Sequence, residues 1–236
     1  AIIKGGTVRL ISRKGKTLDT LDHLKLPLET LPDMILDGEI YAHGRSFQEN
    51  MKLVKKYTKG ETEELVFHVY DQVDESRDFD TRFDEVYKLI KFLPGITVVG
   101  TSKLKGAEYL AGVQQEFLKL GYEGTMVRWG SEGYKVNGRS SNLLKFKEFH
   151  DVDAEIIDVE AAEQRPDWGV PVLSYTNVDG TKVIFRAGVR MSHSDRIDML
   201  ANKEDYIGRI ANVRYFEMTD EGSFRFPIMI GVHEDR

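Results

Sequence analysis

Two lysines in the middle of the chain could neutralise a phosphate group. Lys145 and Lys147 lie two positions apart in the run LLKFK, residues 143–147, which predicts a strand. Residues two apart in a strand lie on the same face, so we expect the two ammonium groups to project together. Side by side they repel each other, and an anion between them relieves that repulsion. The pair therefore favours a phosphate site as strongly as it favours an ordinary charged strand.

Two acidic residues could hold a divalent cation. Glu123 opens the segment EGTMVR, in which the following glycine lets a ligand approach the backbone closely. Glu39 follows Asp37 and Gly38, which we interpret as a tight turn that delivers Glu39 onto a strand. Carboxylate oxygens are the ligands that hard divalent cations prefer. Taken alone, Glu123 also fits a buried strand with one exposed acid, and Glu39 also fits a surface hairpin.

An aromatic residue beside an acid could bind a nucleobase. Tyr70 precedes Asp71 in the segment FHVYD, at the end of a predicted strand. Its ring could stack on a base, although an ordinary core aromatic is favoured when this segment is taken alone. Near the C-terminal end, Arg225 and a late acidic pair could reach over a phosphate. A last strand with a solvated charged tail is the simpler interpretation of that end.

Composition restricts the classes of protein that these residues can belong to. The 236 residues, 41% of them hydrophobic, suffice for one large domain or two smaller ones. No run approaches the roughly 18–20 apolar residues of a membrane span, so we expect no membrane partner. The absence of cysteine excludes disulfides and thiolate metal sites and fits a reducing compartment.

The net charge of −6 means that nucleic acid must be bound by local basic clusters rather than by the field of the whole molecule. One candidate cluster is the stretch 139–147, and another is a lysine-rich predicted helix face, for which a solvated surface is the more common explanation. The lysines of that face are Lys52, Lys55, Lys56 and Lys59.

The elements that must position these residues change in character near residue 150. Before it, a hairpin at 2–11 and strands at 34–41, 65–73, 96–99, 123–129 and 143–149 alternate with helices at 47–57, 80–93 and 106–120. After it come five strands with one helix, at 192–200, following the third strand, which is the element order of an OB-type barrel. We therefore predict an α+β domain over residues 1–150 and an OB-fold β-barrel over 151–236, with the boundary near Asp151–Asp153.

Taken in order, the segments LDGE, FHVYD, EGTMVR, LLKFKE and RFP resemble those of the ATP-dependent DNA ligases. The basic segment Leu10–Lys16 is similar to the family element that follows the nucleophile. The resemblance covers essentially the whole chain and is strongest to the phage-type enzymes of the covalent nucleotidyltransferase superfamily. It implies a nucleotidyltransferase (ATP-grasp-like ligase) domain with antiparallel sheets and flanking helices, N-terminally incomplete here, followed by the OB-fold barrel.

The resemblance also implies an activity. In the family, a lysine attacks the α-phosphate of ATP to give lysyl-AMP, the AMP passes to the 5′-phosphate at a nick, and the 3′-hydroxyl displaces it. The implied ligands are ATP (as AMP) and Mg²⁺, and the implied partner is nicked duplex DNA. We expect a monomer in the cytoplasm of a bacterial or phage-infected cell.

The match assigns roles residue by residue. Glu39 would hold the ribose hydroxyls or help to place the metal, and Tyr70 would stack on adenine. Glu123 would support the catalytic Mg²⁺, while Lys145 and Lys147 would neutralise the phosphate charge that develops during transfer. All five, together with Arg13, would line the nucleotide site.

DNA contacts are assigned to three basic residues. Arg13 would contact a phosphate or the DNA end, and we expect Lys14 and Arg139 to bind DNA beside it.

The nucleophile motif of the family, Lys-x-Asp-Gly-x-Arg, does not occur in this sequence. Asp-Gly occurs only at 37–38 and 179–180, where Ile35 and Asn177 stand two residues before it. We interpret Lys4 as a hairpin residue and expect the motif immediately before Ala1, as in a truncated or split chain. A degenerate, inactive ligase is the other explanation. An RNA ligase, a capping-type nucleotidyltransferase and a non-catalytic ligase-like DNA-binding module also stay open.

The C-terminal end departs from the family as well. His233 stands where the family usually has an arginine ahead of the final acidic pair, and Arg236 replaces a common terminal lysine. Because histidine is only partly charged near neutral pH, we expect self-adenylation to be weak or pH-sensitive.

Overall fold

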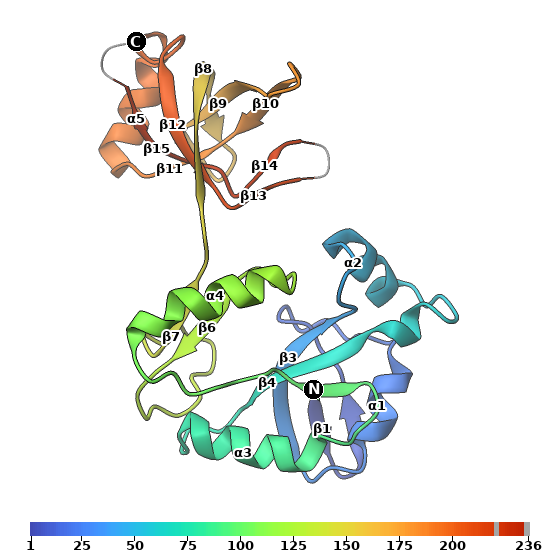
Figure 1. The fold of residues 1–236 in the computed structure, drawn as a ribbon. Helices are drawn as coiled ribbons and strands as arrows, with labels where there is room; N and C mark the ends of the chain where they lie inside the picture. Colours follow the sequence, from blue (N-terminus) through green and yellow to red (C-terminus); the bar gives the residue numbers. More distant parts are fainter. Residues whose placement is uncertain (220–221, 234–236) are drawn as a thin grey trace. The chain divides into compact units, whose positions relative to one another are not determined.

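The computed structural model describes residues 1–219 and 222–233 and contains two compact units, Ala1–Phe146 and Lys147–Arg236 (Figure 1). Each unit has a hydrophobic core of its own. The division lies between Phe146 and Lys147, whereas the sequence led us to expect it after residue 150. Within the described ranges, no helix is both long enough and apolar enough to cross a membrane.

A five-stranded sheet organises the first unit, in the order β2-β1-β3-β4-β5. Its strands are β1 (Ile2–Lys4), β2 (Thr7–Arg9), β3 (Met34–Tyr41), β4 (Val66–Gln72) and β5 (Ile96–Val98). The expected N-terminal hairpin is confirmed, because β1 pairs antiparallel with β2 through a turn at Gly5 and Gly6. The sheet is mixed rather than wholly antiparallel, since β5 runs parallel to β4.

Four α-helices accompany this sheet: α1 (Asp22–Leu28), α2 (Phe47–Lys55), α3 (Phe79–Ile90) and α4 (Leu110–Lys119). Helix α2 begins at a capping box, in which Ser46 and Glu49 satisfy each other's backbone N–H groups. Helix α3 connects the parallel strands β4 and β5, and its Val86 and Ile90 belong to the core. The short 3₁₀ turns are η1 (Thr62–Glu64) and η2 (Ala107–Tyr109).

Strand β3 corrects one expectation. It runs unbroken between β1 and β4, so the predicted Asp37-Gly38 turn and surface hairpin are wrong. Asp37 pairs with Asp71 and Gly38 with Val69, which leaves Tyr70 as an extra residue on β4, a β-bulge. Only glycine fits at position 38, because a Cβ atom there would overlap the backbone oxygen of His68.

A small hairpin completes the first unit. Strands β6 (Thr125–Arg128) and β7 (Leu143–Phe146) pair antiparallel, with Thr125 opposite Phe146. The last residue of β7 therefore lies opposite the first residue of β6. The strand that we predicted over residues 143–149 is shorter than expected. Helix α4 packs against this hairpin and supplies Gln114, whose side-chain oxygen accepts the Thr125 hydroxyl at 2.6 Å.

The second unit is built around a six-stranded sheet in the order β10-β9-β8-β12-β15-β11. Its strands are β8 (His150–Ala162), β9 (Arg165–Thr176), β10 (Lys182–Arg186), β11 (Gly188–Val189), β12 (Ile210–Tyr215) and β15 (Ile228–Val232), and β13 (Glu217–Met218) pairs separately with β14 (Phe224–Arg225). Helix α5 (His193–Ala201) is followed by η3 (Lys203–Asp205), and Ser192 is its N-cap. Strand β11 runs parallel to β15, and the other pairs in this sheet are antiparallel.

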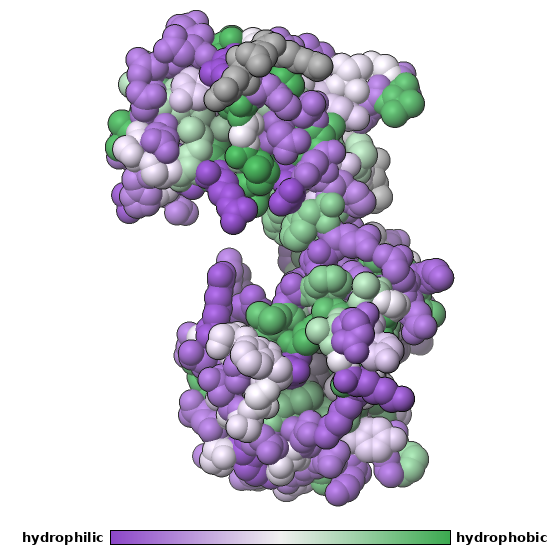
Figure 2. Space-filling view, turned by 60° about the vertical axis from the view of Figure 1, so that its left-hand side comes forward, coloured by the Kyte–Doolittle hydropathy of each residue, from purple (hydrophilic) through white to green (hydrophobic). Residues whose placement is uncertain are grey.

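In Figure 2, hydrophilic residues cover most of the visible surface of each unit, and hydrophobic residues form smaller patches among them.

Candidate functional site

One face of strands β3 and β4 carries the polar and aromatic groups singled out from the sequence. Glu39 is the cross-strand partner of His68, and Tyr70 lies two residues after His68 on β4. Glu39 is exposed and the other two are half-buried, whereas Phe67 and Val69, which alternate with them along β4, are buried in the core. We call Asp37, Glu39, His68 and Tyr70 the site face.

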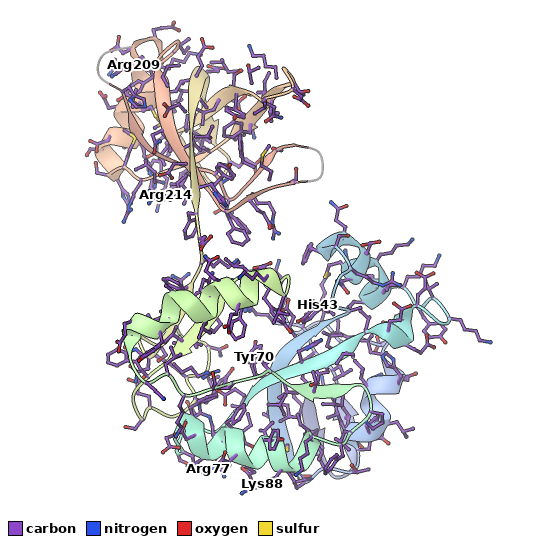
Figure 3. The ribbon with its side chains drawn as sticks, in the orientation of Figure 1. His43, Tyr70, Arg77, Lys88, Arg209 and Arg214 are labelled. Carbon is purple, nitrogen blue, oxygen red and sulfur yellow. The ribbon has the colours of Figure 1, made fainter. Side chains whose placement is uncertain are left out.

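Asp37 fixes the hydroxyl group of Tyr70. Tyr70 donates to Asp37 Oδ1 at 3.3 Å, and Tyr134, from the segment between β6 and β7, donates to Asp37 Oδ2 at 2.6 Å. Burial, followed by the charge of Asp37, raises the pKa of Tyr70 to about 12, and burial with the Asp37 hydrogen bond also raises the pKa of Tyr134. Both phenols therefore keep their protons near neutral pH. Figure 3 labels Tyr70, which belongs to strand β4.

Arg13 lies between β2 and α1 in the N-terminal part of the chain. A turn places it at an exposed tip with Lys14: Gly15 N donates to the backbone oxygen of Ser12 at 2.8 Å and has a positive φ of 75°. The charge of Arg13 partly opposes the rise in the pKa of Tyr70, so its guanidinium acts on that phenol. An exposed cation thus lies within electrostatic reach of the aromatic ring.

A buried ion-pair network holds β4 to its neighbours. The Asp71 carboxylate has no exposed surface and binds Arg82 of α3 in bidentate fashion, at 2.8 and 3.0 Å. Its Oδ2 also accepts from Arg128 of β6 at 2.8 Å. The sequence did not predict this network. Asp71 and Arg128 lie inside recognisable segments, but nothing in the neighbouring sequence indicates that they bind each other or Arg82.

Glu123 and Lys145 meet on the β6–β7 hairpin. Glu123 Oε2 lies 3.8 Å from Lys145 Nζ, and both side chains are 55% exposed. The residue before Glu123, Tyr122, packs its ring 5.0 Å from that of His43, which follows β3 and contacts the backbone oxygen of Leu120 at 2.8 Å (Figure 3). His43 thereby links the end of β3 to the segment that leads into Glu123.

The structure does not bring Lys145 and Lys147 together on one strand. Strand β7 ends at Phe146, and Lys147 begins the second unit, where its Nζ lies 3.5 Å from the ring centroid of Phe216. Because alternation applies only within a paired strand, the end of β7 at Phe146 leaves the same-face arrangement of Lys145 and Lys147 a prediction. Arg139 is exposed between β6 and β7, two residues after Asn137, whose φ is positive at 52°.

The two acids that we predicted to bind metal, Glu39 and Glu123, lie at the surface. Glu39 and Glu123 are exposed carboxylates, and the part of the chain that the structure describes contains no group of three or more potential metal-binding side chains. At the other end, Arg225 pairs with Glu217, and His233 Nε2 lies 3.0 Å from Asp153 Oδ1. The final residues, 234–236, lie outside the described residues.

A family model described as "ATP dependent DNA ligase domain" matches residues 1–147. The chain belongs to the ATP-dependent DNA ligase family. This confirms the resemblance drawn from the ordered segments, and it confirms the α+β nucleotidyltransferase architecture of the first unit. In this ligase-family chain, the matched part contains the site face, the Glu123–Lys145 pair and the Asp71 network.

Curated relatives carry the same name. The chain is 23% identical to the DNA ligase of Enterobacteria phage T4 over 293 residues, which covers 97% of this chain and 60% of the relative. It is 25% identical to the DNA ligase of African swine fever virus (isolate Warthog/Namibia/Wart80/1980) over 234 residues, which covers 91% of this chain and 55% of the relative. The ligase-family chain thus spans between half and two thirds of the length of these relatives.

A solved structure shares the fold. The chain described as "DNA binding with a minimal scaffold: Structure-function analysis of Lig E DNA ligases" superposes with a TM-score of 0.78 at 19% identity, covering 98% of this ligase-family chain and 87% of that one. At this identity the likeness concerns architecture alone.

Proposed function

We propose that the chain is the nucleotidyltransferase core and OB-type portion of an ATP-dependent DNA ligase. Such an enzyme seals nicks in duplex DNA through lysyl-AMP and DNA-adenylate intermediates. The observation that carries the proposal is the site face, which lies inside the family-matched unit: Tyr70 is half-buried with its hydroxyl held by Asp37, on the same face as Glu39. An aromatic ring can stack on a nucleobase, and a carboxylate can accept hydrogen bonds from ribose hydroxyls.

The site face would bind the nucleoside and its phosphate. Tyr70 would stack on adenine, which its ring can do while its hydroxyl stays bound to Asp37. Glu39 would accept hydrogen bonds from the ribose hydroxyls or help to place the metal, and Arg13 would pair with a phosphate. These assignments are supported by the electrostatic effect of both Glu39 and Arg13 on the Tyr70 phenol.

The β6–β7 hairpin would act on the reacting phosphate. Lys145 and Glu123 are 3.8 Å apart and largely exposed, so each can exchange its partner for a ligand at small cost. Lys145, joined by Lys147, would pair with phosphate oxygens, and Glu123, with Glu39, would offer carboxylate oxygen to Mg²⁺. Magnesium is commonly held by one or two carboxylates together with waters and phosphate oxygens, so these acids fit it. When bound, the ion would neutralise charge on the phosphates and on the leaving pyrophosphate.

We also propose that the second unit is an OB-fold barrel. Five long strands with α5 after the third follow the OB element order. Further support comes from β10 and β11, which stand at opposite ends of the strand order although only Ala187 separates them along the chain. A chain that leaves the strand at one edge of a sheet and directly enters the strand at the other edge favours closure of the sheet into a barrel.

Binding to DNA would depend on exposed cations. Arg13, Lys14 and Arg139 are all exposed, and the net charge of −6 leaves local clusters as the source of attraction. We propose nicked duplex DNA as the partner, a monomeric state, and a cytoplasmic setting in a bacterial or phage-infected cell.

A second candidate is a non-catalytic DNA-binding module. It is favoured by one observation, that residues 1–236 contain no Lys-x-Asp-Gly-x-Arg motif. The two candidates differ in the last chemical step, the attack of the 3′-hydroxyl on the DNA-adenylate. That step comes after AMP has passed from the nucleophilic lysine to the DNA.

The discriminating experiment supplies nicked duplex DNA whose 5′-phosphate already carries AMP, with Mg²⁺ and without ATP. A ligase core should join the strands and release AMP, because only the 3′-hydroxyl attack remains. A chain that binds this DNA without joining it would support the non-catalytic module and contradict the ligase core. A parallel nick in RNA tests the RNA ligase alternative.

The first step can be tested with an N-terminal extension that carries Lys-x-Asp-Gly-x-Arg before Ala1. The backbone N and O of Ala1 both bond to Leu36, so such an extension would continue along β3 toward Asp37. With ATP and Mg²⁺, the extended chain should gain the mass of one AMP. A version with alanine in place of the added lysine should gain none.

A further inference from the structure

Tyr134 reaches from the segment between β6 and β7 to strand β3. Its hydroxyl donates to Asp37 Oδ2 at 2.6 Å across 97 residues of sequence, while the Tyr70 hydroxyl donates to Asp37 Oδ1 at 3.3 Å. One carboxylate therefore accepts a phenol on each of its oxygens. The shorter bond comes from Tyr134, so Tyr134 sets the orientation of Asp37 more firmly than Tyr70 does.

The backbone around Tyr134 is anchored independently of its side chain. Tyr134 N donates to the backbone oxygen of Asp74 at 2.9 Å, and the backbone oxygen of Glu132 accepts from Arg82 at 3.4 Å. Gly133 lies so close to Glu75 that a Cβ atom there would overlap the Glu75 backbone oxygen. The ring of Tyr134 is thus delivered to Asp37 from a segment whose path is already fixed.

The protonation states suit this arrangement. Burial, together with the neighbouring Asp37, raises the pKa of both phenols, so near neutral pH both tyrosines keep the protons that they donate to Asp37. Hydrogen bonds to an ionised acceptor are stronger than neutral ones. Asp37 is therefore a single acceptor whose two oxygens are each held by a protonated tyrosine.

We propose that Tyr134 is a positioning residue for an adenine nucleotide. It holds Asp37 in the orientation that fixes the Tyr70 ring for stacking on the base. It also ties the segment that carries Arg139 to the sheet. The first statement rests on the proposed role of Tyr70 in nucleotide binding, whereas the second does not depend on any ligand.

The first test measures AMP binding by titration calorimetry. Tyr134→Phe keeps the ring and removes only the donor, and it should weaken AMP binding about tenfold, since one hydrogen bond to a charged group is lost. Tyr57→Phe is the matched control, because the Tyr57 hydroxyl donates to Glu63 Oε1 at the same 2.6 Å in an exposed position outside the site. Equal affinities of Tyr134→Phe and the wild type would overturn the positioning role.

A double-mutant cycle separates positioning from general loosening. If Tyr134 acts through Asp37 on the Tyr70 hydroxyl, its removal should cost much less than tenfold in a Tyr70→Phe background. If Tyr134→Phe weakens AMP binding by the same factor in both backgrounds, Tyr134 does not act through Tyr70. Melting temperatures measured for all variants report whether each one is folded.

A nucleotide-free test addresses the segment itself. Lys135 and Arg139 are exposed trypsin sites that follow the anchored residues 132–134, and Tyr134→Phe and Asp37→Asn should both speed cleavage there severalfold, whereas Tyr57→Phe should not. Unchanged cleavage would overturn the anchoring role. If the wild type fails to bind AMP, the proposed nucleotide function is contradicted, but the cleavage rates still decide whether Tyr134 anchors this segment.

Discussion

Asp71 shows how one residue can hold several functional segments in place. Its carboxylate is fully buried and meets Arg82 and Arg128, so a strand, a helix and a hairpin converge on a single acid. The guanidinium of Arg128 also lies 4.1 Å from the ring centroid of Phe79. Removing one partner of such a network leaves buried charge without compensation, which costs far more than breaking a surface pair.

We predict that Asp71→Asn destabilises the protein by about 3–5 kcal/mol in urea unfolding, because two arginines lose their counter-charge. The matched control is Asp151→Asn, which breaks the bidentate pair between Asp151 and Arg214, two side chains that are each 42% exposed. That change should cost much less than Asp71→Asn, because water screens an exposed pair. Similar costs for the two variants would mean that the Asp71 network contributes no more than a surface pair.

The phenol of Tyr70 predicts how stability responds to alkaline pH. Its pKa is raised to about 12 in the folded protein, whereas an unfolded tyrosine titrates near 10. The folded state therefore holds the proton more tightly, and this contribution is complete below pH 10 and is lost as the pH rises toward 12. Denaturant melts between pH 9 and 12 should show a smaller fall in stability for Tyr70→Phe than for the wild type. A steeper fall would contradict the assignment.

The paired residues of the β6–β7 hairpin predict a catalytic effect. Lys145→Ala and Glu123→Ala should abolish sealing of the AMP-carrying nick while leaving the melting temperature nearly unchanged, since both side chains are half-exposed. Lys88→Ala, on the exposed surface of α3, is the control and should seal at the wild-type rate (Figure 3). Wild-type sealing by either hairpin variant removes that residue from the proposed site.

Among the elements, the β3–β4 pair is the most constrained, because Gly38 has no space for a side chain. We predict that Gly38→Ala costs about 1–3 kcal/mol through overpacking against β4. Gly112→Ala, in helix α4 where a Cβ atom would meet nothing within 4 Å, should instead stabilise by about 0.5–1 kcal/mol. Thermal unfolding of the two variants should therefore show shifts of opposite sign, and shifts of the same sign would contradict this account of Gly38.

The sequence predicted the elements whose signals are local. Apolar spacing was sufficient for α2 and α3, and glycine pairs were sufficient for the first hairpin. Helix α1 was missed because it has only seven residues, contains Pro27 and begins without a side-chain cap at Leu21. The interpretation of Asp37-Gly38 as a turn failed because the same dipeptide also suits a bulge beside a closely packed strand.

The site was predictable to the same degree. Tyr70, Glu123 and Lys145 lie in segments whose order is recognisable, so they could be proposed before any coordinates. The link between Tyr134 and Asp37 could not, because it spans 97 residues and depends on how two strand pairs pack within one unit. The pairing of Lys145 with Lys147 stays a prediction, because Lys147 follows the last residue of β7 and strand alternation does not extend to it.

At the scale of the whole molecule, two separate cores imply two folding units. The second core is built from residues of the second unit, among them Ile156, Leu173, Met199 and Val213. We predict that a fragment of residues 147–236 folds alone and unfolds cooperatively, as followed by circular dichroism and amide NMR dispersion. A spectrum typical of a random coil would show that this core needs the first unit.

The extra residue in β4 also governs which genetic changes this fold can accept. Side chains alternate between the two sides of a strand, so a codon deletion between His68 and Asp71 would turn the following residues over. The Asp71 side chain would then turn away from Arg82 and Arg128 and face water. A point substitution at Tyr70 leaves the direction of the Asp71 side chain unchanged. Among homologues of this protein, we therefore expect the length of β4 to vary less than the identity of its residues.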